Sequence, residues 1–181
     1  MILTYYIAFT MLLIAYLLGS IPSAVWIGKK YYGIDIREYG SKNAGTTNML
    51  RVLGRRAALP VFALDVLKGF VAVTIVDLIK YDDFFAGTAN DNWFYILRFA
   101  AIFAALLGHI FPVFAGFRGG KGVATLVGGV IAVVVGGEHV APHLHGLSLW
   151  MAVAITLLVA ISANSVSVNI SRKLFRRGLR A

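Results

Sequence analysis

The chain contains no cysteine, and only 14% of its 181 residues are charged. Without cysteine, disulfides, thiolate metal sites and cysteine nucleophiles are excluded. A soluble domain carries about 25% charged residues, so this chain has too few to cover a surface that faces water. The mean hydropathy of +0.80 agrees with this. We therefore expect most of the surface to face lipid.

Acidic residues are scarcer than basic ones, with 8 Asp and Glu against 17 Lys and Arg and a net charge of +9. No nucleic-acid-binding motif accompanies this charge, so we expect no nucleic-acid partner. The basic residues instead favour cytoplasmic loops, a lipid bilayer with anionic headgroups and phosphate-bearing substrates. No basic residue precedes Lys29, and a cleaved secretory signal is therefore not expected.

Long apolar runs dominate the chain, and a membrane-spanning helix needs about 20 such residues. The runs cover residues 2–28, 57–79, 93–114, 123–135 and 147–166, of which the fourth is short and glycine-rich. They lack the alternation of a β-barrel. The sequence predicts an all-α, polytopic transmembrane bundle of five spans in a single integral membrane domain, residues 1–181. Pro22 is expected to kink or break the first span.

Basic connections alternate with non-basic ones along the chain. Residues 29–56, 116–122 and the tail 167–181 are basic, whereas residues 81–92 carry only aspartates as charged side chains. By the positive-inside rule, the three basic segments are cytoplasmic, the N-terminus is outside and the C-terminus is inside. A short motif helix over residues 44–53 would lie on the cytoplasmic side.

Residues 40–54 form the first segment with features of a phosphate site. It opens with small and hydroxyl residues, and the N–H groups at the start of the expected helix would attract anions. Arg51 would add a planar guanidinium suited to phosphate oxygens. A solvated basic loop whose Ser and Asn only cap the helix is the alternative. The predicted phosphate-binding residues are Ser41, Lys42, Asn43, Thr47, Asn48 and Arg51.

The second segment, residues 116–122, places glycines around a single lysine directly before an apolar run. Gly119, Gly120, Lys121 and Gly122 are predicted to bind phosphate, although a flexible hairpin with a basic anchor has the same composition. The spacing differs from that of a P-loop, so nucleotide hydrolysis is not expected.

Three polar side chains inside apolar runs are expected to support the site. Asp65 and Lys68 stand three residues apart and should pair toward the bundle interior. His109 is expected to be a hydrogen-bonded structural residue rather than a catalyst. The outer connection carries His139, His143 and His145 beside a single carboxylate, so we expect neither a metal nor a cofactor.

Three motifs, residues 19–23, 40–54 and 108–114 running into 117–125, together resemble the bacterial acyl-phosphate-dependent glycerol-3-phosphate acyltransferases. The resemblance covers roughly residues 15–126. It implies an enzyme of phospholipid biosynthesis in the inner cell membrane, which transfers an acyl group from acyl phosphate to glycerol 3-phosphate. The products would be lysophosphatidic acid and inorganic phosphate. A functional link to an enzyme that makes acyl phosphate is also implied.

The resemblance also implies roles for individual residues. Ser41, Asn43 and the backbone at Lys42 match phosphate-binding positions, as do Arg51 and Lys121. The catalytic side chains stay unassigned, because the chain lacks the His-x-x-x-x-Asp pair of other acyltransferases: Phe114 stands five residues after His109. Acyl phosphate has a good leaving group, so the enzyme needs mainly to hold two anions together. A substrate phosphate would accept the hydroxyl proton.

Residues beyond Thr125 depart from the family pattern. Members end with His-Arg-x-Asn-Ile-x-Arg, and here Asn169 matches the asparagine while Val166 and Ser167 stand at the His and Arg positions. Asn169 is accordingly included among the phosphate-binding residues. A catalytically degenerate member, or a non-catalytic membrane protein that binds phosphate or lipid headgroups, is the alternative. An anion transporter would show inverted repeats, and the sequence shows none.

Overall fold

The computed structural model describes residues 2–80 and 91–137, and in these ranges all regular structure is helical. The elements are α1 (Ile2–Gly19), α2 (Ser23–Tyr32), the 3₁₀ turn η1 (Ile36–Glu38), α3 (Thr46–Leu53), α4 (Arg55–Lys80), α5 (Asp91–Ile110), the 3₁₀ turn η3 (Val113–Ala115) and α6 (Val123–Gly137). The predicted fifth run, the outer histidines and the basic tail lie outside the described residues.

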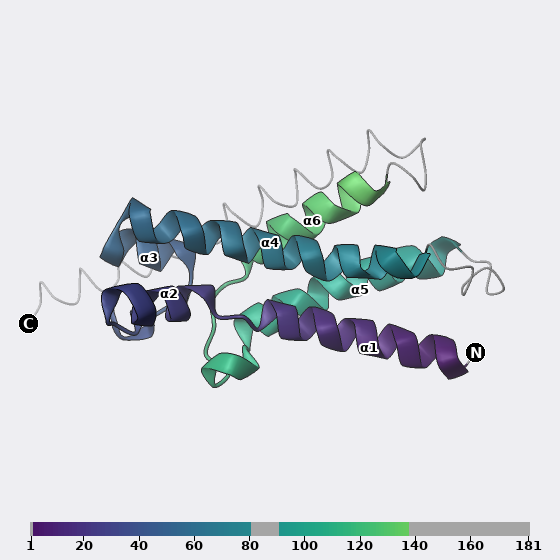
Figure 1. Ribbon diagram of the computed structural model, residues 1–181, viewed down its shortest axis with the longest axis horizontal. Coiled ribbons are helices and arrows are strands. Elements are labelled where there is room, and N and C mark those ends of the chain that lie inside the picture. The colour runs from purple at the N-terminus through teal and green to yellow at the C-terminus, as the bar shows by residue number, and fades with distance from the viewer. Residues whose placement is uncertain (1, 81–90, 138–181) are drawn as a thin grey trace, which may run out of the picture.

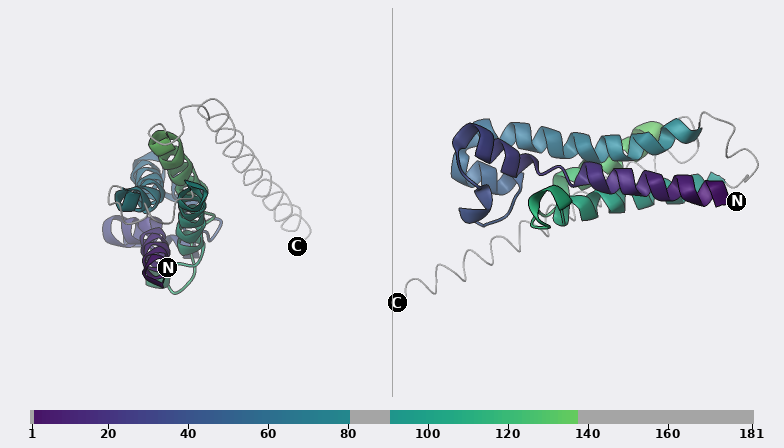
Figure 2. Two further views of the ribbon diagram at one scale, coloured as in Figure 1. Left: turned by 90° about the vertical axis from the view of Figure 1, so that its right-hand side faces the viewer. Right: turned by 60° about the horizontal axis from the view of Figure 1, so that its bottom comes forward.

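The long helices α1, α4 and α5 lie side by side, and α4 also packs along α6 (Figures 1 and 2). The short helices α2 and α3 and the turn η1 gather at one end of this bundle, opposite the N-terminus (Figure 1). Residues of the second segment, 116–122, line the same cavity as residues of the first, so both predicted phosphate sites belong to this end of the molecule. We call it the motif end, and the opposite one the far end.

Within residues 2–80 and 91–137, three helical segments are long and apolar enough to cross a membrane, namely Tyr5–Tyr32, Arg55–Asp77 and Ile96–Ala115. The apolar part of α6, Val123–Gly136, is shorter. The helical class is thus confirmed for the described residues, while the count of five spans and the orientation stay predictions.

Two local predictions can be compared with the structure. The first apolar run is broken, because α1 ends at Gly19 and α2 begins at Ser23, directly after Pro22 as expected. The motif helix was predicted from residue 44 but begins at Thr46. That start was wrong by two residues because Gly45 is extended, with φ −149° and ψ 169°, and serves as the N-cap.

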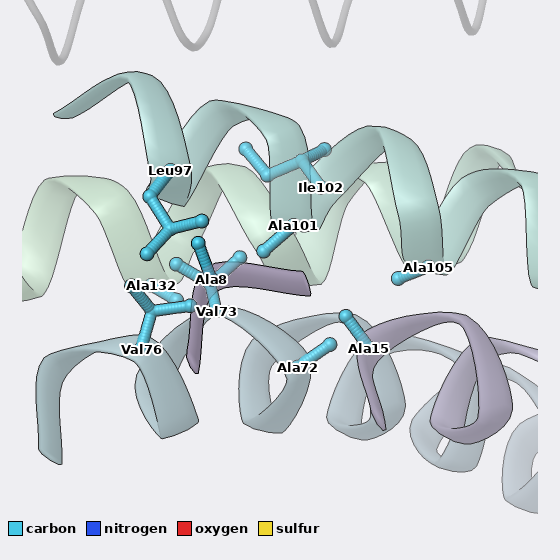
Figure 3. Packing of buried hydrophobic residues seen from close by; sticks show 10 residues of the cluster. All are labelled: Ala8, Ala15, Ala72, Val73, Val76, Leu97, Ala101, Ile102, Ala105 and Ala132. Atoms are coloured by element: carbon cyan, nitrogen blue, oxygen red, sulfur yellow. The ribbon is translucent and has the colours of Figure 1, made fainter. Parts of the chain in front are cut away.

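Small side chains let the helices approach closely. The buried apolar cluster contains Ala8, Ala15, Ala72, Val73, Val76, Leu97, Ala101, Ile102, Ala105 and Ala132 (Figure 3). Gly69 of α4 lies against the backbone of Thr125, and Gly128 of α6 lies against the backbone of Val66. A Cβ at either glycine would overlap the facing carbonyl. Close packing of this kind holds apolar helices together where lipid leaves little hydrophobic drive.

An ion pair between a buried arginine and a partly exposed aspartate joins the helices toward the far end. Arg98 of α5 is completely buried, and its Nε lies 3.0 Å from Oδ1 of Asp77 on α4. Its Nη2 donates a 2.8 Å hydrogen bond to the carbonyl of Ala132 on α6. One guanidinium thus connects three helices. The Asp77–Arg98 pair was not predicted from the sequence.

Candidate functional site

A pocket of about 420 Å³ opens at the motif end. It is lined by Ser41, Asn43, Gly45, Thr46, Thr47, Asn48, Phe62, Asp65, His109, Lys121, Gly122, Val123 and Ala124. These residues come from the first motif segment, from α4, from the end of α5 and from the second segment running into α6. The structure therefore brings the two predicted phosphate-binding segments together around one cavity.

Asn48 shapes the first segment. Its Nδ2 donates 3.0 Å hydrogen bonds to the carbonyls of Ile36 and Tyr39, and its Oδ1 accepts a 2.8 Å bond from the backbone N–H of Ser41. Both amide hydrogens are engaged within the loop, and the residue is 1% exposed. Asn48 is therefore placed to hold the loop in shape, although its side chain borders the pocket.

The start of α3 faces the pocket. Gly45, Thr46 and Thr47 all line it, and Gly45 provides no side-chain cap for the helix. Backbone N–H groups at such a start favour an anion. The hydroxyl of Thr46 is buried there without a hydrogen-bond partner. Thr46 was not among the predicted phosphate-binding residues, because nothing in the sequence pattern distinguishes it from Thr47.

The second segment folds back onto the end of α5. The N–H groups of Gly119 and Gly120 donate 3.1 Å hydrogen bonds to the carbonyls of Ile110 and His109. A Cβ on Gly120 would overlap the His109 ring, so the close approach requires glycine here. This fold leaves Lys121 exposed on the pocket wall.

Not every predicted phosphate ligand lines the pocket. Lys42 and Arg51 are exposed and do not border it, and neither do Gly119 and Gly120. Asn169 lies outside the described residues. The residues that the structure does bring to the cavity are Ser41, Asn43, Thr47, Asn48, Lys121 and Gly122.

A buried polar cluster forms the base of the pocket around Asp65. The predicted pair is present, with Lys68 Nζ 2.8 Å from Asp65 Oδ1. Ser23 donates a 3.0 Å hydrogen bond to the same oxygen, and Nδ1 of His109 lies 3.7 Å from it. His109 Nδ1 also lies 3.1 Å from the Thr125 hydroxyl. The cluster links α2, α4, α5 and α6, and Asp65 and His109 reach the pocket.

Lys68 has a second role at the break between α1 and α2. Its Nζ donates a 2.9 Å hydrogen bond to the carbonyl of Ile21, which directly precedes Pro22. The same carbonyl also accepts a 3.1 Å hydrogen bond from the Ser23 N–H. The lysine therefore adds a second donor to the backbone between the two helices. Among the described residues, no group of His, Cys, Asp and Glu is arranged to hold a metal.

Comparisons with known proteins indicate the family of the chain. A family model described as glycerol-3-phosphate acyltransferase matches residues 9–174. The glycerol-3-phosphate acyltransferase of Enterococcus faecalis is 48% identical over 122 residues, which are 67% of this chain and 51% of that protein. The enzyme of the same name from Chlorobium phaeobacteroides is 43% identical over 162 residues, covering 83% of this chain and 68% of that protein.

Two solved structures are also similar. The crystal structure of PlsY (YgiH), an integral membrane glycerol 3-phosphate acyltransferase, in its glycerol 3-phosphate form has a TM-score of 0.57 at 35% identity, over 88% of this chain and 77% of that one. Its lysophosphatidic acid form has a TM-score of 0.54 at 30% identity, over 94% and 93%. The chain spans about half the length of the Enterococcus relative. The match over most of its own length shows that the chain belongs to the glycerol-3-phosphate acyltransferase family.

Proposed function

We propose that this protein transfers an acyl group from acyl phosphate to glycerol 3-phosphate, giving lysophosphatidic acid and inorganic phosphate for phospholipid biosynthesis. The observation that carries the proposal is the meeting of two anion-attracting segments around one cavity, in a chain of this family. A cavity of about 420 Å³ falls within the range of small-molecule sites. It has room for two phosphate-bearing groups held side by side.

The two walls of the pocket would take one phosphate group each. Ser41, Asn43 and Thr47 stand at the start of α3, where hydroxyl, amide and backbone N–H groups can donate. Lys121 offers a positive charge from the opposite wall. We propose that Asn48 positions the first wall, at the start of α3, rather than binding substrate. Arg51 lies on the exposed surface of α3, three residues after Asn48, and would reach an anion only at the mouth of the pocket.

The apolar part of the pocket suits the acyl group. Phe62 of α4 and Val123 and Ala124 at the start of α6 line the cavity beside the polar walls. A carbonyl next to these side chains would lie between the two phosphate-binding walls. This arrangement supports an acyl phosphate as donor, since that group joins an apolar chain directly to a phosphate.

The proposed reaction needs no nucleophilic side chain. The hydroxyl of glycerol 3-phosphate attacks the acyl carbonyl, a new C–O ester bond forms, and the bond from the carbonyl carbon to the phosphate oxygen breaks. The hydroxyl proton passes to a phosphate oxygen, and inorganic phosphate leaves. Holding both reactants in one site, with Lys121 near the departing charge, would supply most of the acceleration.

The charge of the motif end supports a cytoplasmic, inner-membrane site. Exposed basic residues gather on the elements that surround the pocket, namely Lys29, Lys30, Lys42, Arg51, Arg55, Arg56, Arg118 and Lys121. Such residues favour the cytoplasmic side of a membrane. An enzyme that makes acyl phosphate would have to supply the donor on that side.

The test is phosphate release by the purified full chain with acyl phosphate and glycerol 3-phosphate. We expect release that depends on both substrates, and a fall of about 100-fold for Lys121→Ala, as for the loss of one strong electrostatic contact at a transition state. Arg56→Ala is the matched control, because it removes an exposed basic residue that does not line the pocket. Substrate binding without release would contradict the enzyme and support a catalytically degenerate, headgroup-binding member.

A further inference from the structure

The second motif segment contains a strained turn just before its glycines. Gly116 and Phe117 both adopt left-handed backbone conformations, with φ values of 63° and 59°. For a residue with a Cβ, such as Phe117, this conformation is strained. The surrounding structure must therefore hold the turn in place. Inside the loop, Phe117 donates a 2.8 Å hydrogen bond from its N–H to the Pro112 carbonyl.

Arg37 binds this turn from the other motif segment. Its Nη1 donates a 2.7 Å hydrogen bond to the carbonyl of Ala115, and it lies 3.4 Å from the carbonyl of Arg118. These two carbonyls flank the left-handed pair. The contact crosses 78 residues of sequence from Arg37 to Ala115. One guanidinium thus bridges η1 and the loop that leads to Lys121.

Asp35 fixes the direction of this guanidinium. Its carboxylate accepts hydrogen bonds from Nε and Nη2 of Arg37 at 2.9 and 2.7 Å, and another from the Arg37 backbone at 3.1 Å. The side-chain bonds with Arg37 hold the pKa of Asp35 well below its usual value and raise the pKa of Arg37. A two-point contact leaves the guanidinium little freedom, so Nη1 can point only to the second segment.

Lys29 offers a contrast within the same cluster. Its Nζ lies 3.2 Å from Oδ2 of Asp35, but its side chain is 57% exposed. An exposed pair of this type contributes little to stability. Within the part of the chain that the structure describes, Lys29 makes no hydrogen bond or ion pair with residues 113–118. The bridge between the two segments therefore depends on Arg37 and on the carboxylate that orients it.

The bridge lies close in sequence to both walls of the pocket. Ser41 stands four positions after Arg37, and Lys121 stands three positions after Arg118. The rest of the first wall is fixed separately, since Asn48 ties Ile36, Tyr39 and Ser41 together. A change in the distance between residues 35–38 and 113–118 would thus move one wall relative to the other.

We propose that Arg37, oriented by Asp35, is a positioning residue that sets the distance between the two phosphate-binding walls. The consequence for catalysis rests on the proposed function: two bound reactants must meet within about 3–3.5 Å, and a misplacement of about 1 Å lowers the rate by about 100-fold. Arg37 does not line the pocket and needs no contact with substrate. Its effect on turnover passes through the position of the loops.

The absence of native cysteine permits a direct measurement of this distance. Nitroxide labels on Tyr39→Cys and Phe117→Cys, both exposed positions, report the separation of the two segments by pulsed electron resonance. We expect Arg37→Ala to broaden this distance distribution and to lower kcat for phosphate release by about 10- to 100-fold. Lys29→Ala is the matched control, and should leave both the distribution and kcat at the values of the parent chain.

Three outcomes would overturn the proposal: a parental distance distribution in Arg37→Ala, a broadened distribution with unchanged kcat, or equal broadening in Lys29→Ala. Should Arg37→Ala lose its cooperative thermal transition, Asp35→Asn takes its place. This variant keeps the arginine and an acceptor oxygen, and a parental distance distribution in it would equally overturn the proposal. Absence of turnover in the parent chain would instead contradict the proposed function, and the distance measurement would still decide whether Arg37 bridges the two segments.

Discussion

The two ion pairs that α4 contributes to differ in what surrounds them. Asp65 and Lys68, at the motif end, are accompanied by a serine, a histidine and a threonine, and Asp65 lines a cavity. Asp77 stands 12 residues further along, about 18 Å at the helical rise. Its partner Arg98 is enclosed by helices and bonded to the backbone of α6. Polar groups around the first pair thus serve a site, whereas the second pair holds helices together.

This difference makes a prediction about which losses affect stability and which affect activity. At the far end, the buried Arg98 guanidinium joins packed helices through Asp77 and the Ala132 carbonyl, and neither Asp77 nor Arg98 lines the pocket. At the motif end, Asp65 has Lys68, Ser23 and His109 around it, so the loss of one of them leaves the others in place. Substitutions at the far end should mainly lower the free energy of unfolding, and those at the motif end should mainly lower turnover.

The largest effect on stability is expected for Asp77→Leu. It leaves the buried Arg98 guanidinium without its carboxylate, and the loss of one partner of a buried pair costs about 3–5 kcal/mol. Thermal unfolding of the purified chain in detergent would measure this as a lowered Tm. The double variant with Arg98→Leu removes both charges and should recover most of the loss. A Tm for Asp77→Leu equal to that of the parent chain would mean that the pair does not hold α4, α5 and α6 together.

A smaller loss of stability is expected for Thr125→Val, which removes the hydroxyl beside His109 while keeping the shape of the side chain. An unsatisfied buried partner costs about 1–3 kcal/mol. The His109 ring would also be less fixed against Gly120, so turnover should fall more than Tm alone predicts. Thr74→Val is the control, because the Thr74 hydroxyl bonds only to the Phe70 carbonyl of its own helix. Equal effects in the two variants would contradict the assigned role of the His109–Thr125 contact.

The sequence predicted those parts of the fold that depend on neighbours along the chain. The Asp65–Lys68 pair follows from a spacing of three residues on one helix, and the break at Pro22 follows from the missing proline donor. The Asp77–Arg98 pair joins α4 to α5, 21 residues apart, and depends on how these helices pack. Composition and periodicity carry no such information.

The same limit applies to the pocket. Glycines and hydroxyls marked the two segments, and charge alternation placed them on one side, but neither signal shows which residues line a cavity. Arg51 was predicted from its chemistry and lies on the exposed surface of α3, outside the pocket lining. Arg37 was counted only as one of many basic residues. Its contact with Ala115 depends on two loops whose separation the sequence does not encode locally.

The smallest effect expected is a loss of stability in acid that depends on Asp35, at the edge of the motif end. Because hydrogen bonds from Arg37 lower the pKa of the folded carboxyl, the unfolded chain binds a proton more readily. The stabilisation is complete above the unfolded pKa of about 4, and declines as the pH falls below it. Asp35→Asn carries no such charge, so the Tm difference between the parent chain and this variant should shrink from pH 7 to pH 3. A constant difference would mean that the Arg37–Asp35 contact stabilises the fold through its geometry and not through the charge of Asp35.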